Sequence, residues 1–132
     1  MNPHLFVYGS LLSTAGHPKG ARLAAEARLI GPGSIAGTLY RLSWYPGAVE
    51  SGERGQRVHG EVYALDDPAR SFVWLDAYEG LPPGKLESEK YVRVERPVQL
   101  AAGGETTAWV YLYKGDVRGL PRIPDGRWKT GR

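Results

Sequence analysis

The sequence predicts an α+β fold in which a mixed or mainly antiparallel sheet curls around a core and carries two helices. Five segments are rich in Val, Tyr, Ile, Leu and Thr and are bounded by Gly, Pro or charged residues, as strands are. Two other segments have the composition of helices, one early and one near the middle. The second is too isolated for repeated βαβ units, which argues against a parallel sheet.

The predicted strands recur along most of the chain. They are residues 5–9 (LFVYG), 35–42 (IAGTLYRL), 57–65 (RVHGEVYAL), 91–100 (YVRVERPVQL) and 106–115 (TTAWVYLYKG). The last two alternate most clearly, so Tyr91, Arg93 and Glu95 are predicted to share one face of their strand. The aromatic residues of AWVYLY alternate with Val and Leu in the same way.

Two segments are predicted to be helical. Residues 19–31 (KGARLAAEARLIG) contain good helix formers and end at a Gly-Pro pair. Residues 66–80 (DDPARSFVWLDAYEG) have clearer boundaries. Asp67 can cap the first turn, Pro68 is tolerated in that turn, and Gly80 is placed at the C′ position.

The 132 residues are predicted to form one domain. A chain of this length can bury roughly two-thirds of its extended-chain surface, and no repeat or linker divides it. The basic end, GRWKTGR, is expected to be solvated and frayed. Residues from about 121 to 132 are therefore predicted to form a flexible tail.

The composition excludes several classes of chemistry and partner. The chain has no cysteine, which excludes disulfides, thiolate catalysis and zinc sites built on cysteine. No signal-like start or membrane-length apolar run is present, so we expect a cytoplasmic protein without a membrane partner. The net charge of +3 raises the question of nucleic-acid binding, but the basic residues are scattered among acids and we expect no such partner.

A carboxylic acid interrupts the apolar stripe of the second predicted helix. Phe72 and Leu75 lie three residues apart, and a further step of four reaches Glu79. Burial and the partial negative charge of a helix C-terminus would both raise the pKa of Glu79. A carboxylate tuned in this way is a candidate general base.

A surface interpretation of the same residue stays open. Glu79 could lie at the edge of the stripe, turn towards solvent and pair with Lys85, Lys90 or Arg93. Asp76 lies off the stripe and is interpreted as ordinary helix surface or as a local hydrogen-bonding residue.

The first strand is cut short by a glycine and a serine. Gly9 permits dihedral angles or a close approach that a Cβ would forbid. Such a loop can direct successive N–H groups towards an anion or a developing oxyanion, each donor being worth on the order of 3 kcal/mol. The alternative is a plain turn with Ser10 as a cap.

Other reaction types find little support. Ser10 does not lie in a G-x-S-x-G elbow, and no surrounding pattern marks His4, His17 or His59 as its base. The histidines also lack a metal-binding spacing, and the glycines of GPGSIAG are misplaced for a dinucleotide loop. We therefore expect neither a metal nor a cofactor.

Six segments, in the same order, resemble the γ-glutamylcyclotransferase-like proteins, which are also called AIG2-like. They are FVYGSLL, GTLYRLSWYPGAV, VHGEVYALD, LDAYEG, YVRVERPV and AWVYLY. The resemblance extends from Leu5 to about Tyr113. Each segment alone is a weak signal, but six in the expected order make a specific match.

The resemblance implies a small mixed β-barrel flanked by helices, with a cavity wall that includes Tyr8, Gly9, Ser10 and Leu11. It also implies that Glu79, in LDAYEG, is the catalytic acid/base. The family's activity is intramolecular: the α-amine of a γ-glutamyl amine or γ-glutamyl amino acid attacks its own γ-carbonyl and releases 5-oxoproline and a free amine. The substrate supplies the nucleophile, so the implied cyclotransferase needs no cofactor.

Aromatic and hydroxyl side chains are expected to line the rest of the substrate site. The candidates are Tyr45, Tyr91 and Tyr113, with core or sheet packing as the alternative for each. Arg93 could bind a substrate carboxylate bidentately, or it could balance Glu95 or Glu79.

Residues 80–90 (GLPPGKLESEK) depart from the family pattern. They are longer and more charged than the short connection typical of the family, and we expect a lid or rim at the cavity mouth.

A function of another class also stays open, namely a binding protein that holds a small carboxylated metabolite in the same cavity without a reaction. The carboxylate of Glu79 argues against it, because a binder of anions gains nothing from a buried carboxylate. The departing amine and the oligomeric state are not encoded in any recognisable pattern.

Overall fold

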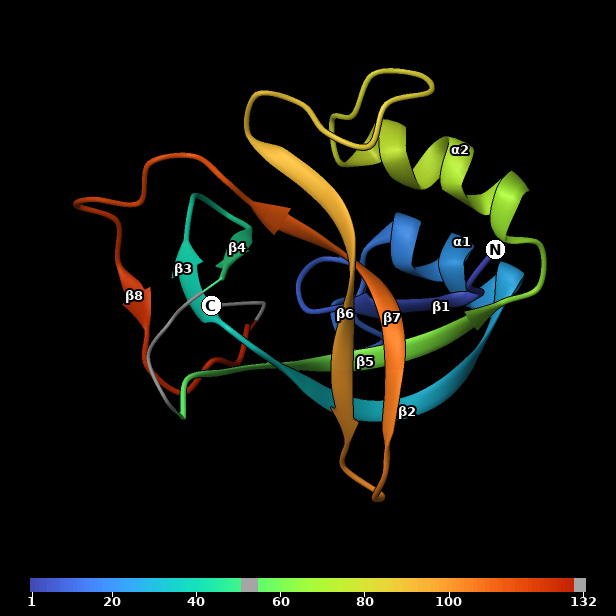
Figure 1. Ribbon diagram of the computed structural model, residues 1–132, viewed down its shortest axis with the longest axis horizontal. Coiled ribbons are helices and arrows are strands. Elements are labelled where there is room, and N and C mark those ends of the chain that lie inside the picture. The colour runs from blue at the N-terminus through green and yellow to red at the C-terminus, as the bar shows by residue number, and fades with distance from the viewer. Residues whose placement is uncertain (51–54, 130–132) are drawn as a thin grey trace.

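The computed structural model describes residues 1–50 and 55–129 of this chain. It confirms the predicted α+β class: a closed five-stranded barrel, a separate three-stranded sheet and two helices (Figure 1). In chain order the elements are β1 (His4–Val7), α1 (Pro18–Glu26), β2 (Ala27–Ala36), β3 (Thr38–Arg41), β4 (Pro46–Val49), β5 (Arg57–Leu65), α2 (Pro68–Tyr78), β6 (Tyr91–Leu100), β7 (Glu105–Tyr113) and β8 (Arg122–Ile123).

The barrel follows the strand order β1-β5-β2-β6-β7 and closes where β1 meets β7. That closing pair is parallel, with Leu5 opposite Trp109, whereas the other neighbours are antiparallel. Closure pairs the edges of the sheet, which would otherwise expose free N–H and C=O groups. The small sheet, β4-β3-β8, lies beside one end of the barrel (Figure 1).

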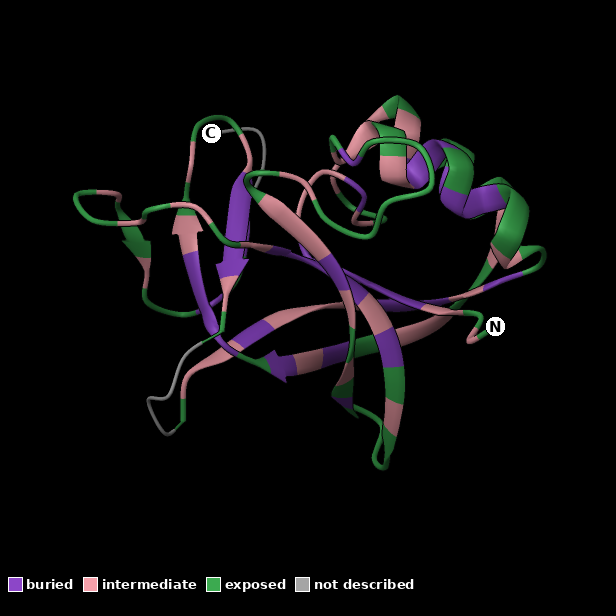
Figure 2. Ribbon diagram, turned by 45° about the horizontal axis from the view of Figure 1, so that its top comes forward, coloured by how far each residue is buried: buried purple, intermediate pink, exposed green. Residues whose placement is uncertain are grey.

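Two buried clusters explain why the first strand is apolar on both faces. Phe6 belongs to the cluster inside the barrel, together with residues such as Val62 and Val110. Leu5 and Val7 belong to a second cluster, in which the outer face of the barrel packs against α1 and α2. Figure 2 shows this burial along β1 and along the inner side of the helices. A strand covered on both sides has no solvent-facing positions at which polar residues would be favoured.

The structure corrects two predicted boundaries. The first helix ends at Glu26, and residues 27–36, predicted in part as helix, form β2. Pairing with β5, from Ala27 opposite Leu65 to Ala36 opposite Arg57, prevails over the local helix propensity. The predicted strand 35–42 is likewise divided at Gly37 between β2 and β3, which belong to different sheets.

The segment from about residue 121 onwards, predicted as a flexible tail, is placed against the fold as far as Lys129. β8 pairs with β3, with Ile123 opposite Leu39. Trp128 is 9% exposed and joins the cluster inside the barrel. Residues 130–132, which belong to the same prediction, lie outside the described residues. No helix in the described part of the chain is long and apolar enough to cross a membrane.

Candidate active site

A cavity of about 340 Å³ opens beside one end of the barrel. Its wall is formed by β1 and the loop after it, the turn between β3 and β4, the end of α2, and parts of β6 and β7. This volume lies within the range of small-molecule pockets, roughly 300–1,000 Å³.

Most of the residues predicted to form a site border this cavity. They are Tyr8, Gly9, Ser10, Leu11, Tyr45, Glu79 and Tyr91. Two predicted residues, Arg93 and Tyr113, are not part of its wall. Tyr113 instead meets the ring of Tyr91 edge-on, with the ring centroids 5.4 Å apart, and so supports a wall residue from behind.

Sequence reasoning missed four aromatic residues of the wall: Phe6, Trp44, Tyr78 and Tyr111. A signal existed for two of them, because Trp44 directly precedes Tyr45 and Tyr78 directly precedes Glu79. Of residues 80–90, only Gly80 borders the cavity, so this segment does not form the expected lid or rim there. It folds back towards β6, where the Arg93 N–H donates to the carbonyl of Leu86 at 2.8 Å.

A Schellman motif places Glu79 at the end of α2. Glu79 is the C-cap residue, the Gly80 N–H donates to Ala77 C=O at 3.1 Å, and the Leu81 N–H donates to Asp76 C=O at 2.8 Å. Gly80 has φ = +84°, as the predicted C′ position requires. The predicted N-cap, Asp67, is also confirmed. The helix therefore ends at a point where Glu79, the next residue along its core-facing side, forms part of the cavity wall.

The carboxyl group of Glu79 is set for proton transfer near neutral pH. Burial, and secondly repulsion by the carboxylate of Asp76, raise its pKa from 4.5 to about 7. Within the described residues, no ion pair or side-chain hydrogen bond involves this carboxyl group, so the pairing with Lys85, Lys90 or Arg93 considered above is not observed. It is half-buried and faces the cavity.

This raised pKa predicts a pH-dependent cost in stability. Because folding raises the pKa of Glu79, the folded state binds a proton more tightly than the unfolded state, and stability is lost as the pH rises from about 4.5 through about 7. The difference in unfolding free energy between Glu79→Gln and the parent chain is therefore expected to shift by about 2–3 kcal/mol in favour of the variant as the pH rises from about 4 to about 8. Urea denaturation at both pH values measures this, and parallel pH curves for the two proteins would contradict it.

The loop after β1 brings unpaired backbone donors to the same cavity. A Cβ on Gly9 would lie 2.9 Å from both Cδ and Cγ of Pro46, so glycine is required by the close approach of the loop to the start of β4. Within the described part of the chain, the N–H groups of Gly9, Ser10 and Leu11 make no hydrogen bond. Backbone donors without acceptors beside a cavity are available to a bound molecule.

Four of the wall tyrosines remain neutral at physiological pH. Burial is the main cause that raises the pKa of Tyr8, Tyr78, Tyr91 and Tyr111 above the usual tyrosine range, and the charge of Glu79 adds to this for each. The Tyr8 hydroxyl is fully engaged, since it donates to Tyr111 C=O at 2.6 Å and accepts from the Ala48 N–H at 3.2 Å. Glu79 is thus the wall residue whose charge changes near pH 7.

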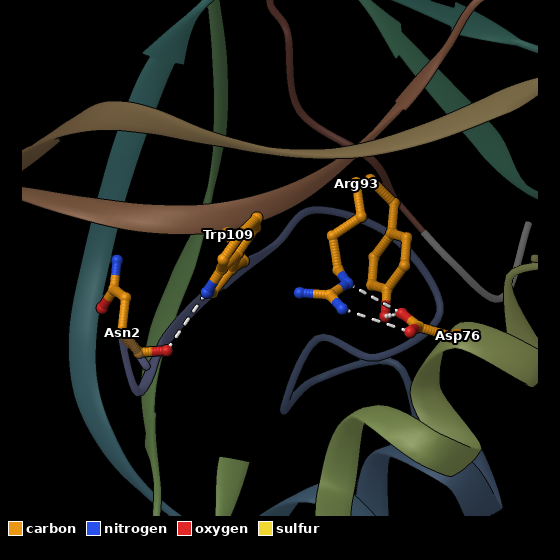
Figure 3. A network of polar contacts seen from close by, with 5 residues as sticks. Asn2, Asp76, Arg93 and Trp109 are labelled. Atoms are coloured by element: carbon orange, nitrogen blue, oxygen red, sulfur yellow. Dashed lines mark hydrogen bonds and ion pairs between the residues drawn. The ribbon is translucent and has the colours of Figure 1, made fainter. Parts of the chain in front are cut away.

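Asp76, interpreted from the sequence as helix surface, is instead the centre of a partly buried network. Arg93 donates to both of its carboxylate oxygens, from Nε at 2.8 Å and from Nη2 at 3.2 Å, and the Tyr111 hydroxyl donates to it at 2.6 Å. Figure 3 shows Arg93 reaching Asp76 from β6. The Arg93 guanidinium, 4% exposed, lies over the rings of Phe72 and Trp109. Arg93 therefore anchors α2 and Tyr111, both of which shape the cavity.

The described residues contain no prepared metal-binding site. No group of three or more His, Asp or Glu residues is arranged there to hold an ion.

The remaining polar pair at the cavity is Ser10 and Tyr78, whose hydroxyl oxygens share a hydrogen bond of 2.7 Å. Ser10 has no base within this arrangement other than the neutral tyrosine.

Comparison with known proteins gives a consistent result. The family described as "Gamma-glutamyl cyclotransferase, AIG2-like" matches residues 5–130. The chain is 35% identical over 125 residues to the "Gamma-glutamylcyclotransferase family protein YtfP" of Escherichia coli K12, and the match covers 94% of each chain.

Solved structures show the same fold. The solution structure of E. coli YtfP is 36% identical, has a TM-score of 0.61 and covers 95% of both chains. A crystal structure of an AIG2-like protein from Mus musculus has a TM-score of 0.68 at 24% identity and covers 98% of this chain and 96% of that one. YkqA from Bacillus subtilis has a TM-score of 0.71 at 24% identity, and the match spans 97% of this chain but only 40% of YkqA.

Proposed function

Because this chain belongs to the gamma-glutamyl cyclotransferase, AIG2-like family, we propose that it converts a γ-glutamyl amine or γ-glutamyl amino acid into 5-oxoproline and a free amine. The observation that carries the proposal is the position of Glu79: a carboxyl group with a pKa of about 7, free of ion pairs in the described chain, faces a cavity beside a loop with free backbone donors. A positioned base of this kind is typically worth about 10²- to 10⁴-fold in rate.

The proposed reaction is an intramolecular acyl transfer. The α-amine of the glutamyl group attacks the γ-carbonyl carbon, a C–N bond closes the five-membered lactam, and the C–N bond to the departing amine breaks. Glu79 takes a proton from the α-ammonium group and passes it to the departing nitrogen before the C–N bond breaks. The attacking nitrogen loses its second proton as the lactam forms, and the released amine takes up a proton and leaves as an ammonium ion. The N–H groups around Gly9 and Ser10 hold the α-carboxylate or the carbonyl oxygen as charge develops. Binding the chain in its bent form supplies the proximity that the ring closure needs.

Direct assay tests this function. The purified protein is incubated with a panel of γ-glutamyl amines and γ-glutamyl amino acids, and 5-oxoproline is measured. Turnover of at least one member supports the proposal, and no turnover across a broad panel overturns it. Saturable binding of a carboxylated metabolite without product, retained in Glu79→Gln, would favour the binding protein.

The pH dependence of the reaction is a further expected outcome. The active combination is ionised Glu79 with a protonated substrate amine, so kcat/KM is expected to fall about tenfold per pH unit below about 7. The alkaline limb should follow the α-amine of the substrate, because only its protonated form belongs to the active combination. A pH–rate profile for two substrates checks this. An acidic limb that begins well below about pH 6, or that moves with the substrate, would contradict the assignment to Glu79.

A further inference from the structure

The mouth of the cavity carries an exposed tryptophan that the proposed chemistry does not use. Trp44 lies in the turn between β3 and β4 and borders the cavity, yet it is 64% exposed. A single exposed apolar side chain is ordinary on a protein surface. This one, however, is held by other rings: it stacks parallel to His17, with centroids 6.4 Å and planes 1° apart, and meets Tyr45 edge-on at 5.0 Å.

The ring beneath Trp44 is itself fixed. His17 caps α1 and its Nδ1 accepts the Lys19 N–H at 3.0 Å, so the neutral ring carries its hydrogen on Nε2. Nε2 faces the Tyr78 hydroxyl at 3.5 Å, and Tyr78 meets the His17 ring edge-on at 5.6 Å. Tyr78 in turn bonds Ser10 in the loop at the cavity. Three segments of the chain thus build one rigid aromatic wall, and rigid aromatic side chains bind at low entropic cost.

The charges of the cavity limit what can lie against this wall. Among the described wall residues, Glu79 is the one charged side chain and no Lys or Arg is present. In the proposed reaction the free loop N–H groups serve the glutamyl part of the substrate. A second carboxylate, carried by the departing amine, would lose water without gaining a cation and would be repelled by Glu79.

We propose that Trp44, held in place by its stack on His17, binds the departing part of the substrate and selects γ-glutamyl amines whose amine is aromatic or otherwise apolar and carries no carboxylate. This inference rests on the proposed function and names the substrate class of the same site. Trp44 is its specificity-determining residue.

Matched substrates test each part of this proposal. In γ-glutamyl-2-phenylethylamide the departing amine has a ring and no charge, and γ-glutamyl-phenylalanine adds only a carboxylate. The ethylamide lacks the ring. We expect kcat/KM for the phenylethylamide to exceed that for each of the other two by roughly 10-fold or more.

Variants assign the preference to the wall. Trp44→Ala is expected to reduce the ratio of kcat/KM between phenylethylamide and ethylamide at least about fivefold, and Trp44→Phe should retain part of it. Val73→Ala is the matched control, because Val73 is 75% exposed on α2 and is not part of the cavity wall. It should leave every ratio unchanged.

The outcomes distinguish failure of this inference from failure of the proposed function. Turnover with a phenylethylamide-to-ethylamide ratio that Trp44→Ala does not change overturns the inference alone. Equal or faster turnover of γ-glutamyl-phenylalanine also overturns it. Calorimetric titration with 2-phenylethylamine and ethylamine tests the wall without chemistry: preferential binding that Trp44→Ala removes supports it, and its absence counts against it. No 5-oxoproline from any compound overturns the proposed function instead.

Discussion

Glu79→Gln is expected to lower the rate of 5-oxoproline formation by about 10²- to 10⁴-fold, the range that a positioned general acid/base supplies. The amide has nearly the shape of the carboxyl group but cannot take a proton from the α-ammonium group. Since Glu79 has no ion-pair partner in the described chain, the substitution breaks no charge interaction that holds the fold. Single-turnover and steady-state assays at about pH 7.5 measure the loss.

Ser10→Ala is the matched comparison at the same cavity. It removes the hydroxyl that bonds Tyr78 but keeps the backbone N–H, which is the group assigned to the substrate. We expect a loss of no more than about tenfold, because a nucleophilic serine is not part of the reaction. A Glu79→Gln variant with full activity, or a Ser10→Ala variant as inactive as Glu79→Gln, would show that the roles are assigned wrongly.

The second large effect concerns stability. Asp76→Asn is expected to reduce the free energy of unfolding by about 3 kcal/mol, because the Arg93 guanidinium would remain buried without its counter-ion. The Asn side chain also offers one acceptor oxygen where the carboxylate now receives three hydrogen bonds, two from Arg93 and one from Tyr111. Urea denaturation followed by tryptophan fluorescence measures the loss.

Two further variants identify its cause. Arg93→Met removes the same ion pair but leaves the negative charge of Asp76 unpaired. The Asp76 side chain is 19% exposed, whereas that of Arg93 is 4% exposed, so Arg93→Met should cost less stability than Asp76→Asn. Glu87→Gln removes an exposed ion pair with Lys114 and should change stability by less than about 0.5 kcal/mol. If Arg93→Met costs more than Asp76→Asn, the loss comes from packing against Phe72 and Trp109 and not from an unpaired buried charge.

Much of the fold could be predicted because its signals are local. The caps of α2, Asp67 and Gly80, are residue types whose side chain or conformation fits one position of a helix end. The alternation in the last two long strands is confirmed by their pairing, with Tyr91 opposite Tyr113. The end of the first helix was predicted wrongly because residues 27–36 satisfy their backbone through β5, a partner about thirty residues away in the sequence.

The sequence by itself determined the α+β class and the family, and it drew attention to Glu79 and Gly9, because each depends on a residue type at a defined place in a local pattern. Only the tertiary structure decided that Asp76 binds Arg93, and that His17, Trp44 and Tyr78 form one wall. These groups come from separate segments, and the apolar periodicity of one segment reports which side is buried but not which distant side chain it meets. Closure of the barrel, with α2 packed on its outer face, determines which side chains come into contact and therefore the shape of the site.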